Sequence, residues 1–298
     1  SRFTRSITTK KSKGFSAEEI FAQSLENSGA GYFDYYLLHA MSADNVQYAD
    51  ENGLWDFMKK LKAEGRVREI GFSFHDTPEV LEEILTKHPE MEFVQLQINY
   101  ADWENPSVQS RRCYEVARSF GKPVVIMEPV KGGTLAELGA ETAALFDGVA
   151  PEVGLPARAL RFAASLPGVR AVLSGMSTLA QMEENTATLA EVPVLSEAEQ
   201  AAYTAVREKL ASAPTIPCTA CKYCMENCPV GMEIPRLFRV MNGYLTYGNR
   251  AKSKEDYARA TKEHPQASEC LSCYACADVC PQHLEIPELL RRVAETLE

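Results

Sequence analysis

A cysteine pattern that occurs twice limits what the end of this chain can fold into. Eight of its nine cysteines lie between positions 218 and 280, and only Cys113 lies elsewhere. Each copy has three cysteines spaced three apart, a fourth four positions later, and then a proline. The copies are Cys218, Cys221, Cys224, Cys228 and Pro229, and Cys270, Cys273, Cys276, Cys280 and Pro281. A backbone with this spacing can wrap a compact cluster of several metal atoms, while a distant residue supplies the last ligand.

The proline makes each copy match a bacterial pattern in which the fourth cysteine binds the other of two clusters. The sequence therefore predicts two 4Fe–4S clusters. The expected ligands of one are Cys218, Cys221, Cys224 and Cys280, and those of the other are Cys270, Cys273, Cys276 and Cys228. Zinc is disfavoured because structural zinc sites pair two Cys-x₂-Cys knuckles across a longer loop. A disulfide framework is typical of small secreted chains.

The composition indicates a folded protein and excludes several kinds of partner. The chain has 298 residues, 45% of them hydrophobic, which is enough to bury a sizeable core. Its net charge of −10, without a dense Lys/Arg stripe, disfavours nucleic acid and membrane surfaces as partners. No run reaches the roughly 18 apolar residues of a membrane span, and the first residues lack the apolar core of a signal peptide. We therefore expect a soluble protein of the reducing cytoplasm.

Short apolar runs alternate with amphipathic helical stretches over residues 1–212. The expected strands are Ser6–Thr9, Phe33–Leu38, Glu69–Phe74, Phe93–Ile98, Pro123–Met127 and Val169–Leu173. The expected helices are Ala17–Asn27, Leu54–Ala63, Pro78–Leu85, Ser107–Phe120, Pro156–Ala164 and Thr178–Thr188. Six strand–helix units predict an α/β fold, either a (β/α)₈ TIM barrel or a doubly wound sheet. A complete barrel takes about 250 residues and eight units. The first one or two units are therefore expected to be missing, or their place to be covered by something else.

A linker separates this part from the cysteine-containing end. Residues 212–217 carry two prolines, between a helix expected at Glu197–Leu210 and the first cysteine. Such a segment is typical of a domain boundary. Beyond it, helices are expected around Pro235–Gly243, Lys254–Thr261 and Pro287–Leu297. The sequence thus predicts a barrel domain over residues 1–212 and a small, mainly α-helical, two-cluster domain over residues 213–298.

Polar residues lie at the ends of several expected strands, where α/β barrels place their active sites. The segments are Asp34–His39, Gly71–His75, Gln95–Tyr100 and Leu173–Thr178, followed by Gln181, Glu184 and Asn185. In this order they resemble the aldo/keto reductase family over residues 1 to about 210. With the cysteine module, the whole chain resembles the bacterial members of that family that carry a C-terminal two-cluster ferredoxin-type domain.

The resemblance implies a TIM barrel that binds NADP or NAD at its C-terminal face and acts on a small carbonyl or alcohol. His39 matches the histidine that orients the substrate carbonyl. The matching cofactor-binding positions are Ser73, Gln97, Ser177, Gln181, Glu184 and Asn185. Ser73 and Gln97 correspond to the residues that bond the nicotinamide carboxamide. The segment after Leu173 would hold the adenosine phosphate, and Glu184 with Asn185 would contact the adenine.

Three departures from the family pattern bear on activity. Lys10 matches the lysine of the catalytic tetrad, and the tetrad's tyrosine and aspartate precede that lysine, so they are expected to fall before Ser1. A chain that begins at Ser1 is therefore expected to have weak activity. Gly175 and Gln181 replace a lysine and an arginine that commonly pair with the 2′-phosphate of NADP, which leaves NAD open. Met127 stands where the family often stacks an aromatic ring on the nicotinamide.

Two classes of function follow. The first is an NAD(P)-dependent oxidoreductase linked to electron transfer through the clusters, with a redox partner such as a flavoprotein, because hydride carries two electrons and each cluster passes one. The second is a non-catalytic electron-transfer or interaction protein with a degenerate barrel. Each barrel residue also has a purely structural interpretation: His39 as a strand cap, Ser73 and Gln97 as satisfied polar groups, and Cys113 as a small apolar residue.

Overall fold

The computed structural model describes residues 3–8, 16–106, 108–218, 220–280 and 282–298. The chain divides into two compact units. The first consists of Ser1–Gly132 and Ala157–Ser196, and the second of Gly133–Pro156 and Glu197–Glu298. In the described residues, no helix is both long enough and apolar enough to cross a membrane.

The first unit contains a sheet of six parallel strands in sequential order. The strands are β1 (Phe3–Thr8), β2 (Phe33–Met41), β3 (Val67–Phe74), β4 (Phe93–Gln97), β5 (Val124–Met127) and β6 (Val169–Val172). A doubly wound sheet reverses its strand order at a switch point, whereas a TIM barrel adds each strand beside the previous one. The sequential order therefore confirms the barrel prediction, and the sheet corresponds to part of such a barrel.

Helices connect the strands at nearly all the expected places. They are α1 (Ala17–Ser28), α2 (Ala43–Glu51), α3 (Leu54–Ala63), α4 (Pro78–Lys87), α5 (Ser110–Ser119), α7 (Leu155–Ala164) and α8 (Leu179–Thr188). Local chemistry sets their starts: Ser16 and Glu19 form a reciprocal capping box on α1, and Pro78 is at the start of α4. Helix α5 begins at Ser110 rather than at the expected Ser107, because Gln109 has a left-handed φ of 52°. Ser107 lies outside the described residues.

The two faces of the sheet carry different cores, because side chains alternate along a strand. On the outer face of β2, Tyr36 is fully buried and its ring meets that of Phe21 from α1 edge-on, at 4.9 Å between centroids. On the inner face, Leu37, Phe93 and Val125 form a buried cluster from β2, β4 and β5. The inner cluster is the packed interior expected of a barrel.

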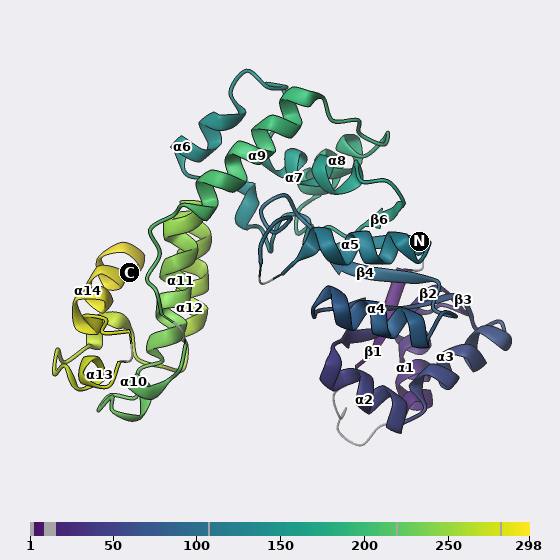
Figure 1. Cartoon of the computed structure of the whole chain (residues 1–298), viewed down its shortest axis with the longest axis horizontal. Coiled ribbons are helices and arrows are strands. Elements are labelled where there is room, and N and C mark those ends of the chain that lie inside the picture. Colours follow the sequence, from purple (N-terminus) through teal and green to yellow (C-terminus); the bar gives the residue numbers. More distant parts are fainter. Residues whose placement is uncertain (1–2, 9–15, 107, 219, 281) are drawn as a thin grey trace. The chain divides into compact units, whose positions relative to one another are not determined.

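The second unit is helical. Its helices are α6 (Ala140–Ala143), α9 (Glu197–Ala211), α10 (Tyr223–Glu226), α11 (Ile234–Tyr247), α12 (Arg250–Thr261), α13 (Ala275–Asp278) and α14 (Ile286–Leu297), with short 3₁₀ turns at Thr134–Ala136, Ala144–Phe146 and Ala267–Glu269. Helices α11 and α12 run side by side (Figure 1). Their core includes Phe238, Met241 and Leu290. Gly248 ends α11 at a φ of 70°, and a Cβ there would lie 2.6 Å from the Gly139 Cα.

Residues ahead of the expected boundary at 212 also belong to this helical unit. The ring of Tyr203 in α9 packs against that of Phe146, with centroids 5.5 Å apart. Lys209 Nζ lies 2.8 Å from a carboxylate oxygen of Glu141. The two domains at 1–212 and 213–298 stay a prediction of the sequence, and the compact units follow a different division.

Candidate functional site

Three of the expected site residues come to one end of the sheet. His39, Ser73 and Gln97 lie at the carboxyl ends of β2, β3 and β4. Ser73 is fully buried, Gln97 is partly buried, and His39 is exposed. Because the strands are parallel neighbours, their carboxyl ends share one face, which is where barrels bind ligands. Lys10, the fourth residue expected there, lies outside the described residues.

The backbone at this end includes left-handed residues that are not glycine. Ala40, directly after His39, has a φ of 56°, and its N–H donates to Ser73 Oγ at 2.7 Å. Glu128 and Lys131, which follow β5, have φ values of 57° and 51°. Such conformations cost free energy and concentrate at functional sites. The hydroxyl of Ser73 is thus already an acceptor for the backbone, and its own proton remains to be donated.

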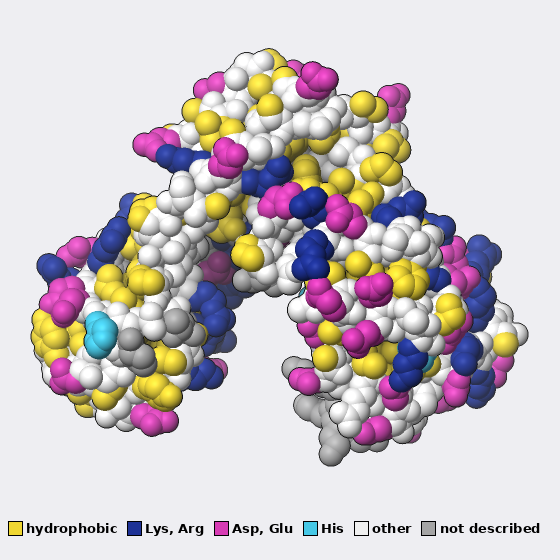
Figure 2. All heavy atoms as spheres, in the orientation of Figure 1, with side chains coloured by type: hydrophobic (Ala, Val, Ile, Leu, Met, Phe, Trp, Pro, Cys, Tyr) yellow, Lys and Arg dark blue, Asp and Glu magenta, His cyan; other side chains and the backbone are white. Residues whose placement is uncertain are grey.

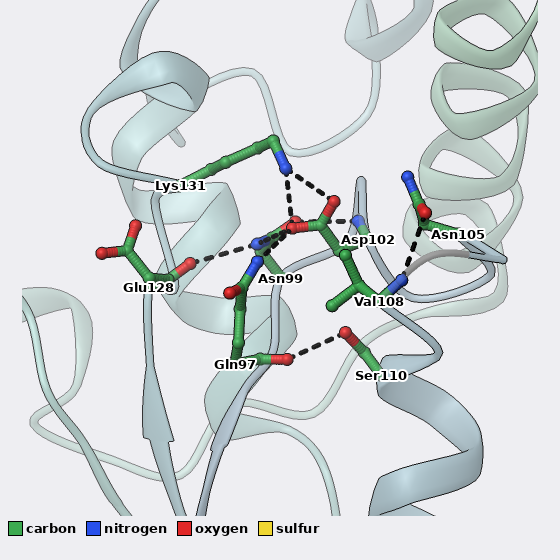
Figure 3. Close-up of polar contacts among 8 residues, drawn as sticks. All are labelled: Gln97, Asn99, Asp102, Asn105, Val108, Ser110, Glu128 and Lys131. Atoms are coloured by element: carbon green, nitrogen blue, oxygen red, sulfur yellow. Dashed lines mark hydrogen bonds and ion pairs between the residues drawn. The ribbon is translucent and has the colours of Figure 1, made fainter. Parts of the chain in front are cut away.

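A polar network joins the ends of β4 and β5 (Figure 3). Its centre is the buried carboxylate of Asp102, which accepts from Gln97 Nε2 at 3.0 Å and from Asn99 Nδ2 at 2.9 Å. Lys131 Nζ lies 2.6 and 2.8 Å from the two carboxylate oxygens. Ser110 Oγ donates to the backbone oxygen of Gln97 at 2.8 Å, which attaches the start of α5 to the end of β4. Gln97 is therefore fixed by both its main chain and its side chain.

The strand-end pattern does not identify Asn99, Asp102 and Lys131 as members of this site. The signal was present, since the polar residues Asn99 and Asp102 follow β4 and Lys131 follows β5, before two glycines. Gln95 has no expected role, although it pairs in register with Ser73 and its amide lies 3.3 Å from the Met127 sulfur.

A cavity of about 160 Å³ opens beside Gln97. It is lined by Phe74, His75, Asp76, Leu96, Gln97, Val108, Ser110 and Cys113. Partial burial, with a smaller contribution from His39, lowers the pKa of His75, which therefore favours the neutral imidazole at pH 7. Burial also raises the pKa of the Cys113 thiol to about 11. Cys113 is thus a poor nucleophile, and its Sγ lies 3.7 Å from the backbone oxygen of Asp76.

The remaining expected cofactor residues lie directly before α8 or within it. Thr178 and Gln181 form a capping box, in which Gln181 Oε1 accepts from the N–H groups of Ser177 and Thr178 at 2.8 and 3.2 Å. Asn185 Nδ2 donates to Ser174 Oγ at 3.1 Å, and Glu184 is exposed on the same helix. The side chain of Gln181 therefore occupies two N–H groups that an anion would otherwise use.

The cysteines form two groups of four in the second unit. One cavity is lined by Cys218, Cys221, Cys224 and Cys280, and another by Cys228, Cys270, Cys273 and Cys276. Each group thus combines three cysteines of one run with the fourth of the other, which is the grouping expected from the sequence. Apolar residues such as Phe238 and Leu290 complete the cavity walls. In the described part of the chain, no three His, Cys, Asp or Glu side chains converge as ligands of a metal ion.

The backbone of the two cysteine runs repeats its unusual conformations. Ala220 and Lys222 in the first run have positive φ values of 56° and 69°, and Ser272 and Tyr274 at the same offsets in the second have 50° and 61°. Alternation of right- and left-handed residues turns successive N–H groups toward one point and makes an anion-binding concavity. Since a cluster with four thiolates is anionic, this repeated backbone fits 4Fe–4S groups.

Hydrogen bonding and thiol chemistry agree with this fit. The N–H of Met232 points at Cys228 Sγ from 3.4 Å, and bonds of this kind tune iron–sulfur clusters. Burial, together with neighbouring cysteines, raises the pKa values of Cys224 and Cys276 to about 11. Thiols in such surroundings need a cation to become thiolates, and a bound metal supplies one.

Comparison with known proteins gives two family matches. The model of the aldo/keto reductase family matches residues 5–208, and that of a 4Fe–4S dicluster domain matches residues 217–284. A search of curated proteins found no match.

Solved structures give the same fold for the first match. The holo form of aldo-keto reductase AKR11C1 from Bacillus halodurans is 21% identical, with a TM-score of 0.52 over 63% of this chain and 66% of that one. An aldo/keto reductase from Klebsiella pneumoniae in complex with NADP and acetate is 20% identical, with a TM-score of 0.53 over 68% of each chain. This chain thus spans about two thirds of the length of these reductases.

Proposed function

Because this chain belongs to the aldo/keto reductase family, we propose that it is an oxidoreductase whose strand-end face binds NADP or NAD. The meeting of His39, Ser73 and Gln97 at the carboxyl end of the sheet carries this proposal. The Klebsiella pneumoniae reductase of the same fold was solved with NADP. A small carbonyl or alcohol is the proposed substrate.

Each residue has a separate task in this proposal. The bound nicotinamide supplies or accepts the hydride. His39 hydrogen-bonds the substrate carbonyl, and the neutral His75 beside it adds no competing charge. Ser73 retains a hydroxyl proton to donate, and Gln97 retains an acceptor oxygen, and these are the two kinds of hydrogen-bonding group that a carboxamide requires.

The start of α8 would hold the adenosine end of the cofactor. Ser177 lies just before the helix, with its N–H bonded to Gln181 Oε1, while Glu184 and Asn185 lie further along the helix. Gly175 and Gln181 provide no cation for a 2′-phosphate, and a charge-assisted bond there contributes about 1.5–3 kcal/mol. We therefore expect less than about a hundredfold preference for NADP over NAD.

The second unit would hold two 4Fe–4S clusters. The two four-cysteine cavities and the repeated left-handed residues support this number. Clusters pass electrons singly, whereas a hydride carries two. A cofactor such as a flavin, which can take up two electrons together and release them one at a time, is needed to link the clusters to hydride chemistry. We propose that a partner protein supplies it and that both proteins are cytoplasmic.

Calorimetric titration of the purified full chain with NADP and with NAD tests the cofactor site. We expect saturable binding at micromolar to millimolar strength, weakened about tenfold by Gln97→Leu through loss of one hydrogen bond. His39→Ala is the matched control, since His39 addresses substrate, and its cofactor affinity should stay within about twofold of wild type. If neither dinucleotide binds the wild-type protein, the proposal fails.

A further inference from the structure

The carboxylate of Asp102 is completely buried, and both of its oxygens have hydrogen-bond or ion-pair partners. Its side chain has 0% exposure, and it faces Lys131, Gln97 and Asn99 together. A buried charge is tolerated only when it is paired and hydrogen-bonded, because desolvation costs several kcal/mol. One oxygen of the carboxylate, Oδ2, accepts from all three side chains, at 2.8 Å from Lys131, 3.0 Å from Gln97 and 2.9 Å from Asn99. Asp102 is thus the shared acceptor of the whole network.

The Asp102 carboxylate determines the orientation of the Gln97 side-chain amide. A carboxamide has an acceptor oxygen and a donor nitrogen of nearly the same shape, and it can rotate to exchange them. A carboxylate only accepts, so the nitrogen of Gln97 must face Asp102. Figure 3 shows the nitrogen turned toward Asp102 and the oxygen turned away from it. Among the described residues, no donor hydrogen-bonds to Gln97 Oε1, which remains available to a ligand.

The loop after β5 is bent so that it completes this arrangement. Glu128 and Lys131 both take left-handed φ values, of 57° and 51°, and Lys131 thereby returns to Asp102. Asn99 connects the parts, since its Nδ2 reaches the Glu128 backbone oxygen at 3.1 Å as well as Asp102. Its Oδ1 accepts from the Asp102 N–H at 2.8 Å. Two strained residues and a buried ion pair thus serve one amide orientation.

We infer that Asp102 is a positioning residue that fixes Gln97 so that its side-chain oxygen accepts a hydrogen bond from the NH₂ of the nicotinamide carboxamide. This inference rests on the proposed cofactor site and specifies its chemistry. The site should distinguish a carboxamide from a group of similar shape that has no N–H donor. In 3-acetylpyridine adenine dinucleotides, a methyl group replaces that NH₂, so they serve as the probe.

The experiment measures the affinity of wild type and variants for the better-binding natural dinucleotide and for its 3-acetylpyridine analogue. Wild type should bind the natural ligand about three- to tenfold more tightly, the effect of one hydrogen bond. Asp102→Ala frees the Gln97 amide to rotate, and this ratio should fall to within about twofold. Asp102→Asn can keep an oxygen at the Oδ2 position and should retain the preference. Gln97→Leu, which leaves Asp102 in place, should also abolish it.

Each result has a distinct meaning. An equal loss of affinity for both ligands in Asp102→Ala, with the ratio kept, overturns the positioning role and leaves Asp102 as a structural residue. Equal binding of both ligands by wild type, or a preference that survives Gln97→Leu, overturns the inference even if Asp102→Ala does not fold. No binding of either ligand by wild type instead refutes the proposed cofactor site, on which the inference depends.

Discussion

The ion pair between Lys131 and Asp102 has a surface counterpart in the same unit. Lys131 and Lys59 each lie 2.6 Å from a carboxylate oxygen, of Asp102 and Asp56 respectively. The Lys131 pair is 26% and 0% exposed, and the Lys59 pair is 49% and 82% exposed. Breaking a buried pair by removing one partner costs about 3–5 kcal/mol, whereas an exposed pair contributes about 0–1 kcal/mol.

Lys131→Met should therefore lower the free energy of unfolding by about 2–4 kcal/mol, because it leaves the buried Asp102 without its cation. This range is slightly below that of a fully buried pair, since Lys131 is partly exposed. Lys59→Met, the matched control, should change it by less than about 1 kcal/mol. Urea denaturation of both proteins, followed by far-UV circular dichroism, gives the comparison. Equal effects would mean that burial does not strengthen the Lys131 pair.

The buried thiol of Cys113 leads to a pH-dependent prediction. Its pKa is raised to about 11 from an ordinary 9, and only the thiolate reacts with iodoacetamide. At pH 8 the Cys113 peptide should alkylate about a hundredfold more slowly in the native protein than in the unfolded one, as measured by mass spectrometry. The native rate should keep rising to about pH 11, whereas the unfolded rate levels off near pH 9. Matching rates at pH 8 would contradict the burial of this thiol.

At the level of single residues, strand position could be predicted and long-range pairing could not. Alternation within an expected strand places His39, Ser73 and Gln97 at strand ends from the sequence alone. The contact of Asp102 with Lys131 joins residues 29 positions apart. It depends on left-handed conformations in the β5 loop, which residue types other than glycine do not announce.

Helix α8 sets the expected choice between NADP and NAD. The N–H groups of Ser177 and Thr178, directly before its first residue, are occupied by Gln181, which supplies no charge. Gln181→Arg should add a cation near the 2′-phosphate and raise the ratio of NADP to NAD affinity about ten- to hundredfold. Met182→Arg places the same charge on the adjacent exposed residue and should change the ratio by less than about twofold. Calorimetric titration of both variants with NADP and with NAD measures this ratio. An equal change of the ratio in the two variants would refute a 2′-phosphate site at Gln181.

The exchange of ligands between the two cysteine runs predicts which pairs of Cys→Ser variants lose or alter the same cluster. Cys228 lines a cavity with Cys276, and Cys280 lines one with Cys224. In electron paramagnetic resonance of the reduced protein, Cys228→Ser and Cys276→Ser should alter the same cluster signal. Cys280→Ser and Cys224→Ser should both alter the other signal. A spectrum in which Cys228→Ser resembles Cys224→Ser would show that each run binds its own cluster.

Elements with clear periodicity were predicted well, and those without it were not. All six strands and the long helices lie within a few residues of the expected ranges. Helix α2, Ala43–Glu51, was not expected because its sequence is polar and buries only Ala49. Its start depends on a cap, in which the side chain of Ser42 accepts from the Asn45 N–H.

For the whole molecule, the sequence predicted the order of the two matched parts, and the compact units follow a division of their own. The sequential strand order excludes a doubly wound sheet, which alternating apolar runs alone had left open. The packing of Tyr203 on Phe146 could not be predicted, because neither residue belongs to a motif and 57 positions separate them. Tertiary packing of this kind depends on the completed fold rather than on local pattern.

We propose that this chain of the aldo/keto reductase family carries two 4Fe–4S clusters on its eight clustered cysteines. The iron and acid-labile sulfide content of the anaerobically purified protein tests this proposal. We expect close to eight irons and eight sulfides per chain, as two four-iron clusters require. About one or two zinc ions per chain without labile sulfide, or four irons that persist after full reconstitution, would contradict it.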